Sequence, residues 1–297
     1  MMNKKDGRIR QYRGKTEGMK NRILQIVILL SVTIVQGFAA GVERLSVPSA
    51  SMNKEIPVLV VLPDIALGSE GKSCPVVYLL HGYGGNAETW INIKPDLPQI
   101  ADQKGIIFVC PDARNSWYWD SPIDPAFRYE TFVASELVEY VDLHYKTVTD
   151  REGRAITGLS MGGHGALWIA FRHQETFGAC GSMSGCTDIR PFPKNWEISR
   201  RLGSLAENPK LWDEYTVINN LDSLRSEALA ILIDCGVEDF FLDVNKELHA
   251  SLLARQIDHD FTIRPGGHNR AYWHNAIDYQ ILFFEKYFRR YSEQQVE

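Results

Sequence analysis

The feature that most constrains the fold is a serine enclosed by glycines, the sequence GLSMG at residues 158–162. A serine can stand on a very sharp turn only where the neighbouring positions carry almost no side chain, and glycines before and after it meet that condition. Residues 154–159 are predicted to form a short strand that runs into this turn, and residues 162–173 a helix that leaves it. A serine on a strand–turn–helix unit is predicted to be an exposed nucleophile.

A second glycine-rich loop follows an apolar strand upstream. Residues 76–80 (VVYLL) are predicted to form a buried strand that ends in the loop HGYGG. In a nucleophile-elbow fold, one oxyanion-hole amide comes from such a loop and the other from the residue after the serine. We therefore predict the amides of Tyr83 and Met161 as the oxyanion hole, with Gly84 as the alternative to Tyr83. His81 is expected to hold the loop together.

Three carboxylates follow the predicted strand at residues 229–234, in the segment DCGVEDFF. Asp234 belongs to the end of the strand, so its side chain is able to point into the sheet. Glu238 and Asp239 lie in the loop, where a carboxylate can reach an imidazole. We favour Asp239 as the catalytic acid, and Glu238 is the next candidate.

Eight histidines compete for the role of base. His268 is the preferred one, because it lies in a Gly-Gly loop directly after the predicted strand 260–264. His274, at the start of the last helix, is the alternative, whereas His164 lies one turn after the serine and is expected to pack beneath it. The resulting order of serine, acid and histidine along the chain is that of an α/β-hydrolase. All three follow strand ends, where open α/β sheets place their sites.

The alternation of strands and helices favours an α/β-hydrolase fold with a mostly parallel sheet covered by helices on both faces. The predicted strands are 55–62, 76–80, 106–110, 154–159, 178–183, 229–234 and 260–264, and the predicted helices are 129–145, 162–173, 243–256 and 274–290. Residues 187–225 interrupt this alternation and are longer than an ordinary connection. We expect them to form a small cap over the active site.

Four segments of the chain, GLSMGGHGAL, HGYGG, DCGVEDFFL and GGHNRAYW, together carry a family resemblance. They resemble the putative-esterase family of α/β-hydrolases, related to S-formylglutathione hydrolase (esterase D). That family also includes secreted feruloyl and acetyl-xylan esterases and mycolyltransferases. By motif match, the resemblance implies Ser160 as nucleophile, Asp239 as acid and His268 as base. The HGYGG loop differs from the threonine- and cysteine-bearing segment of the glutathione-linked hydrolases, so the secreted branch fits better.

The first forty residues have the pattern of a targeting segment. Residues 1–22 carry eight basic and two acidic residues, and residues 23–35 are an uncharged, mostly apolar run that is shorter than a membrane-spanning helix. Small residues follow at positions that a signal peptidase reads. We predict a signal peptide at residues 1–40, with Met19 as a possible start of translation and a retained membrane anchor as the alternative. The protein would then be secreted or periplasmic, with no stable membrane insertion.

Residues 41–297 are predicted to form a single domain. Removing residues 1–40 would change the formal net charge from −5 to −11, and an acidic surface argues against nucleic acid as a partner. Five cysteines are too few for a disulfide framework. Buried free thiols are expected, and a pair between Cys180 and Cys186 is the alternative. We find no cluster with metal-ligand spacing and expect no metal or cofactor.

These features predict a secreted serine esterase that forms an acyl-enzyme, acting on a small-molecule or oligosaccharide ester. Aromatic residues near the strand ends are expected to bind the substrate, because flat rings stack on a phenolic acyl group or a sugar. The chosen residues are Trp117, Tyr118, Trp119 and Trp273. Feruloyl and acetyl esters of carbohydrates are the leading substrates. An acyltransferase of the mycolyltransferase type, a thioesterase like S-formylglutathione hydrolase and a catalytically silent carbohydrate-binding protein are the alternatives.

Overall fold

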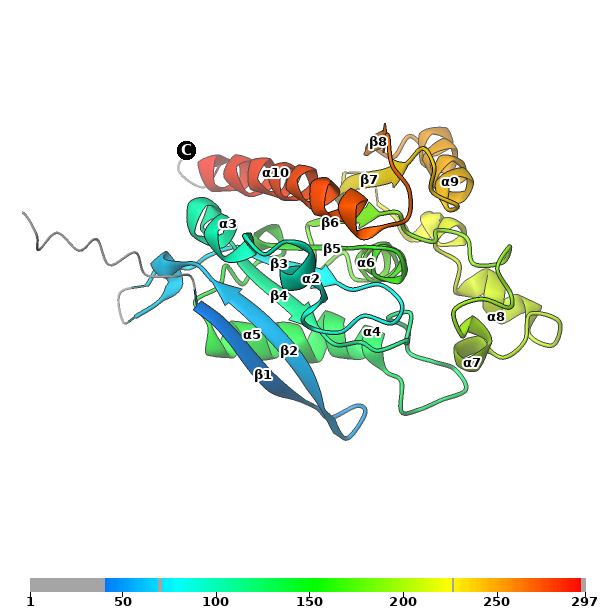
Figure 1. The fold of residues 1–297 in the computed structure, drawn as a ribbon, viewed down its shortest axis with the longest axis horizontal. Helices are drawn as coiled ribbons and strands as arrows, with labels where there is room; N and C mark the ends of the chain where they lie inside the picture. Colours follow the sequence, from blue (N-terminus) through cyan, green and yellow to red (C-terminus); the bar gives the residue numbers. More distant parts are fainter. Residues whose placement is uncertain (1–40, 69–70, 226, 295–297) are drawn as a thin grey trace, which may run out of the picture. The chain divides into compact units, whose positions relative to one another are not determined.

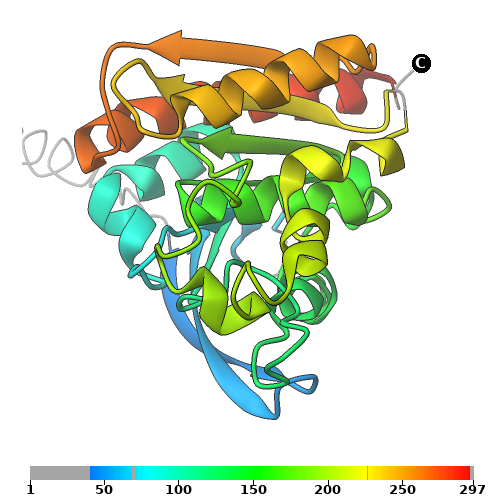
Figure 2. The same ribbon diagram turned by 90° about the vertical axis from the view of Figure 1, so that its right-hand side faces the viewer.

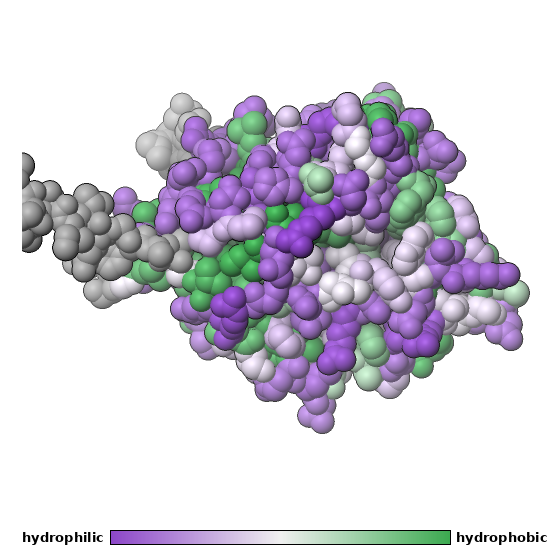
Figure 3. All heavy atoms as spheres, in the orientation of Figure 1, coloured by the Kyte–Doolittle hydropathy of each residue, from purple (hydrophilic) through white to green (hydrophobic). Residues whose placement is uncertain are grey.

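The computed structural model describes residues 41–68, 71–225 and 227–294, all of which belong to one compact unit, Ala39–Glu297. The predicted signal peptide at residues 1–40 lies outside the described residues. Within the described part of the chain, no helix is both long and apolar enough to cross a membrane. The face seen in Figure 3 carries mostly hydrophilic residues, with smaller hydrophobic areas between them.

The described residues build an eight-stranded sheet with the order β1-β2-β4-β3-β5-β6-β7-β8 (Figure 1). The six neighbouring strands β4, β3, β5, β6, β7 and β8 pair in parallel, whereas β1 pairs with β2 and β2 with β4 in the antiparallel direction. The predicted α/β-hydrolase fold with a mostly parallel sheet is therefore confirmed. The strands are β1 Gly41–Ser49, β2 Lys54–Leu62, β3 Val76–Leu80, β4 Ile107–Pro111, β5 Arg154–Gly158, β6 Ala179–Met183, β7 Ala230–Gly236 and β8 Asp260–Arg264.

The central strands are buried on both faces, as expected for parallel strands beneath two helical layers. Along β3 the side chains alternate between two cores: Val76, Tyr78 and Leu80 belong to one, and Val77 and Leu79 to the other. The first core is completed by α5 Leu137–His144, α6 Met161–Arg172 and α9 Leu242–Ala254. The second is completed by α2 Thr89–Ile93, α3 Leu97–Lys104 and α10 Arg270–Gln294.

Four elements differ from the expected pattern. The expected helix at 129–145 consists of α4 Tyr129–Thr131, a π-helical turn at Phe132–Glu136 and α5. The strand β1 and the helices α2 and α3 were not predicted. The turns of α2 and α3 bury only Trp90, Ile93, Leu97 and Ala101, which is too short a pattern for the 3.6-residue period to stand out.

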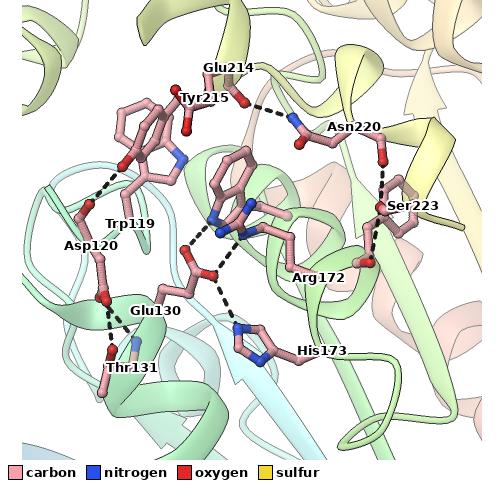
Figure 4. A network of polar contacts seen from close by, with 12 residues as sticks. Trp119, Asp120, Glu130, Thr131, Arg172, His173, Glu214, Tyr215, Asn220 and Ser223 are labelled. Carbon is pink, nitrogen blue, oxygen red and sulfur yellow. Dashed lines mark hydrogen bonds and ion pairs between the residues drawn. The ribbon is translucent and has the colours of Figure 1, made fainter. Parts of the chain in front are cut away.

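Residues 187–225, called the cap segment below, contain the short helices α7 Ile198–Leu202 and α8 Pro209–Glu214 and two 3₁₀ turns, Val217–Asn219 and Leu221–Ser223 (Figure 2). Tyr215 attaches this segment to the body of the domain. Its ring stacks on Trp168, with centroids 5.1 Å apart, and meets Trp119 edge to face at 5.6 Å. Its hydroxyl donates a hydrogen bond to the carbonyl of Asp120 at 3.1 Å (Figure 4). The cap segment is thus packed against the core by an aromatic anchor.

Candidate active site

Ser160 stands at the junction of β5 and α6 in a strained backbone conformation. Its φ is 56° and its ψ is −119°, a region that costs a non-glycine residue about 1–3 kcal/mol. The flanking glycines are required because a side chain at either position would collide with neighbouring backbone atoms. A Cβ on Gly158 would lie 2.4 Å from the backbone of Gly162, and a Cβ on Gly162 would lie 2.3 Å from the carbonyl oxygen of Leu80. The serine takes the left-handed conformation, and the glycines let the backbones approach closely enough to impose it.

The structure brings together the serine, histidine and acid selected from the sequence. His268 Nε2 lies 2.9 Å from Ser160 Oγ, and His268 Nδ1 lies 2.9 Å and 3.1 Å from the two carboxylate oxygens of Asp239. A carboxylate only accepts, so Nδ1 carries the proton and Nε2 is left to accept from the serine hydroxyl. Asp239 is buried and also accepts from the backbone N–H of Phe241 at 2.9 Å, which fixes its orientation.

The alternative residues lie away from this hydrogen-bonded chain. Asp234 is buried at the end of β7, where its carboxylate accepts from the Tyr272 hydroxyl at 2.5 Å and from the Arg264 guanidinium. Burial raises the pKa of Asp234. Glu238 and His274 have exposed side chains, and neither takes part in a side-chain hydrogen bond to the Ser160–His268 pair.

The loop after β3, residues 81–85, is called the oxyanion loop below. The two nitrogens of His81 hold it in place. Nδ1 bonds to the carbonyl of Gly82 at 2.7 Å, and Nε2 accepts from the backbone N–H of Ala113 at 2.9 Å. The N–H of Gly84 donates to the Asn115 side chain at 2.9 Å, so it is already engaged. The amides of Tyr83 and Met161 donate to no other group among the described residues, and this difference favours Tyr83 over Gly84 for the oxyanion hole.

Three of the four residues predicted to bind substrate lie in the core instead. Trp117, Tyr118 and Trp119 are each at most 1% exposed, so the prediction that they form an aromatic rim is wrong. Trp117 and Tyr118 have positive φ angles of 60° and 62°, which turn this segment inward behind the oxyanion loop. Trp117 donates its indole N–H to the carbonyl of Trp196, and the Tyr118 hydroxyl donates to the carbonyl of His81. Trp117 and Tyr118 therefore support the site from beneath.

The serine opens into a pocket of about 310 Å³, of which the predicted Trp273 forms one wall. Tyr83 from the oxyanion loop and Trp196 from the cap segment form other walls of this pocket. The full lining is Gly82, Tyr83, Gly84, Gly85, Thr89, Ile93, Leu159, Ser160, Trp196, His268 and Trp273. Tyr83, Ile93, Leu159, Trp196 and Trp273 make its walls largely aromatic and aliphatic, and Ser160 and His268 supply the reactive groups.

Phe240, the residue directly after Asp239, was not selected from the sequence. Its ring stacks on Trp196 with centroids 5.7 Å apart and covers the His268 imidazole at 4.3 Å. It is 54% exposed, unlike Phe241, which is buried beside it. An aromatic pair next to Asp239, the predicted acid, is the sequence signal that points to this residue.

The structure also shows how the other reactive side chains are placed. All five cysteines are buried and free, so Cys180 and Cys186 are not joined to each other. Within the described ranges, no group of three or more His, Cys, Asp or Glu side chains is arranged to hold a metal ion.

Comparison with known proteins identifies the family. Residues 49–284 match the family described as "Putative esterase". The chain belongs to this esterase family. It is 25% identical to an acetyl esterase of Caldicellulosiruptor saccharolyticus over 80% of this chain and 95% of that protein. It is 27% identical to an esterase of Mycobacterium tuberculosis, and the match covers 71% of this chain but only 52% of that relative, about half its length.

A solved ferulic acid esterase has the same fold, with a TM-score of 0.74 and 29% sequence identity over 85% of this chain and 100% of that one. The acetyl esterase and the solved ferulic acid esterase agree with the membership of the esterase family.

Proposed function

We propose that this protein is a secreted serine esterase that hydrolyses aryl-acyl esters of carbohydrates, with feruloyl esters as the leading substrates, through Ser160, His268 and Asp239. The observation that carries the proposal is the continuous hydrogen-bonded chain from Asp239 through His268 to the serine hydroxyl. This series of hydrogen bonds ends at the serine hydroxyl, which lies in a pocket with aromatic walls. The export signal predicted at residues 1–40 supports secretion.

The geometry supports acyl transfer in two steps. Ser160 Oγ attacks the ester carbonyl while its proton passes to His268 Nε2, and Asp239 stabilises the imidazolium that forms. The carbonyl oxygen becomes an oxyanion and accepts from the N–H groups of Tyr83 and Met161. The tetrahedral intermediate then collapses, and the alcohol leaves with the proton from His268. In the second step water loses a proton to His268 and attacks the acyl-enzyme. The new tetrahedral intermediate collapses, His268 returns that proton to Ser160 Oγ, and the carboxylic acid leaves.

The pocket dimensions favour a large planar acyl group over an acetyl group. A volume of about 310 Å³ lies at the lower end of the range for drug-sized ligands and exceeds what two carbon atoms need. Trp196 and Trp273 supply flat surfaces for an aromatic ring, which gains from offset or edge-to-face contacts. The relatives include both an acetyl esterase and a ferulic acid esterase, so the size of the pocket is what separates the two.

The experiment that tests this proposal is a kcat/KM panel with methyl ferulate, acetylated xylo-oligosaccharide, tributyrin and S-formylglutathione. We expect methyl ferulate to be the best substrate. Ser160→Ala should lower kcat by about 10⁴-fold or more with the fold intact, whereas Ser46→Ala, an exposed serine on β1, should change nothing. A tenfold preference for tributyrin or the thioester, or more than a tenth of the turnover remaining in Ser160→Ala, contradicts the proposal.

Transfer to an acceptor alcohol instead of water would use the same residues. Product analysis with and without an added alcohol distinguishes the two reactions, because only the transferase converts the acyl group into a new ester in preference to the free acid.

A further inference from the structure

A second pocket adjoins the one that contains Ser160. It has a volume of about 460 Å³ and shares Gly84 and Gly85 of the oxyanion loop with the first. Whereas aromatic and aliphatic residues line the first pocket, the second is lined mainly by charged and amide side chains. Six of them define what we call the arginine pocket: Asp112, Arg114, Asn115, Glu197, Arg200 and Arg201.

The arginine pocket is positively charged although the chain as a whole is acidic. Its lining holds three guanidinium groups and two carboxylates, in a chain with a formal net charge of −5. Beside the lining, Arg201 donates to Asp124 at 2.9 Å and stacks on Phe127 at 3.6 Å, and Lys54 lies over the same ring. An excess of positive charge at the edge of a reactive pocket attracts an anionic part of a substrate.

Most of the acceptors in this pocket are already in use. One carboxylate oxygen of Asp112 accepts from the backbone N–H of Arg114 at 2.9 Å. The two oxygens of Glu197 contact Arg200 at 2.7 Å and the Asn115 amide at 3.3 Å. The Asn115 oxygen in turn accepts from Gly84.

The donors are not all in use. Arg201 is buried, and its Nε has no hydrogen-bond partner in the part of the chain that the structure describes, but this atom is itself closed to solvent. The exposed guanidinium of Arg114 is attracted electrostatically by the Asp112 carboxylate, but it makes no ion pair or hydrogen bond within contact distance of any described residue. Arg114 is therefore the accessible donor that lacks an acceptor in direct contact. A neutral sugar, which brings as many donors as acceptors, fits this imbalance less well than a carboxylate.

The backbone holds these side chains in unusual conformations. Arg114 has a φ of 49°, and the consecutive residues Trp196 and Glu197 have φ angles of 46° and 55°. Left-handed conformations of non-glycine residues are costly and concentrate at ligand-binding sites. Trp196 lines the serine pocket and Glu197 lines the arginine pocket, so one strained turn of the cap segment contributes a wall to each.

We propose that the arginine pocket binds a carboxylate carried by the alcohol part of the ester, with Arg114 as its main partner. A planar guanidinium matches the two oxygens of a carboxylate and can form two parallel hydrogen bonds with them. The preferred substrate is then an ester of an acidic sugar, a uronate, whose acyl group enters the serine pocket while its carboxylate enters the arginine pocket. This inference rests on the proposed function for the reaction at Ser160.

Two matched substrates test the inference, the feruloyl esters of methyl glucoside and of methyl glucuronoside. They differ only in a hydroxymethyl group where the uronate has a carboxylate. We expect the wild-type enzyme to prefer the glucuronoside ester by about tenfold in kcat/KM at low ionic strength, and the preference to shrink as salt is added. Arg114→Gln should bring the ratio of the two kcat/KM values close to one. Arg255→Gln is the matched control and should keep the wild-type ratio, because this exposed arginine directly follows α9 and pairs with Asp222 of the 3₁₀ turn Leu221–Ser223.

A wild-type ratio near one, or the same preference in Arg114→Gln as in the wild type, overturns the inference. Binding of the unesterified methyl glucuronoside, compared with methyl glucoside by calorimetry, gives a second readout that needs no turnover. Arg114→Gln should weaken binding of the glucuronoside only. If the wild type fails to hydrolyse methyl ferulate but still selects the glucuronoside in the binding measurement, the proposed acyl specificity fails and the arginine pocket stands.

Discussion

His164 makes the stability of the fold depend on pH. It lies on α6 one turn after the nucleophile and is fully buried. Its Nε2 accepts from the indole N–H of Trp119 at 2.9 Å, and its Nδ1 bonds to the carbonyl of Cys186 at 2.7 Å. The imidazole is therefore neutral, with a proton on Nδ1. Burial lowers the pKa of His164 to about 4.

The size of the effect follows from this pKa. In the unfolded chain a histidine titrates at about 6.5. Between that value and about 4, the unfolded chain binds a proton that the native protein does not, so the free energy of unfolding falls as the pH falls. Above about pH 6.5 the neutral His164 takes nothing from the free energy of unfolding. Below this pH the free energy of unfolding decreases progressively, because the unfolded chain gains a proton at this histidine. Between about pH 7.5 and pH 5 the loss amounts to about 2 kcal/mol.

Urea unfolding of the wild type and of His164→Gln at these two pH values measures this contribution. Glutamine has a donor and an acceptor for the same two partners but does not titrate, so the variant should lose about 2 kcal/mol less than the wild type over this pH interval. His274→Gln removes an exposed histidine and serves as the control that should follow the wild type. If the wild type and His164→Gln show the same pH dependence, His164 is not a buried neutral imidazole and the reasoning is refuted.

Two further predictions concern the acid and the leader. Asp239→Asn should lower kcat by about 10⁴-fold because an amide in place of the carboxylate favours the wrong histidine tautomer, whereas Glu238→Gln should keep near-normal turnover of the same ester; a crippled Glu238→Gln would reassign the acid. Protein recovered from the native host should begin near residue 40 or 41 when its N-terminus is sequenced, and an intact N-terminus on protein from the cytoplasm would reject export.

The sheet and the reactive residues could be predicted because each has a local sequence signal. The buried strand β3 is a continuous apolar run, and both β3 and the edge strand β8 begin and end where predicted. Ser160, Asp239 and His268 each follow a predicted strand, so strand ends that are far apart in the chain were expected at one edge of the sheet. The strand β1 lacks this signal, because it lies at the edge of the sheet and alternates between exposed and buried residues only near its end.

The walls of the site were harder to predict because they depend on backbone angles that the sequence does not display. The segment from Trp117 to Trp119 has the composition of an aromatic rim, yet two left-handed residues turn it into the core. The same geometry explains why Trp196 lines the pocket. Its carbonyl is held by the indole of Trp117, and a left-handed φ at Trp196 itself brings it beside the serine.

The chemistry and the specificity of this site have different structural origins. Ser160 and the loop that carries His268 are joined to the sheet by short turns, and the elbow is forced into shape by backbones that touch at Gly158 and Gly162. The backbone atoms that these two glycines approach belong to Leu80, His81 and the elbow itself, and none belongs to the cap segment. Part of the two pocket walls comes instead from Trp196 and Glu197 of the cap segment, and Phe240, next to Asp239, stacks on Trp196. Substitutions at these three positions should therefore alter which ester is bound while the hydrogen-bonded chain from Asp239 to the serine stays in place.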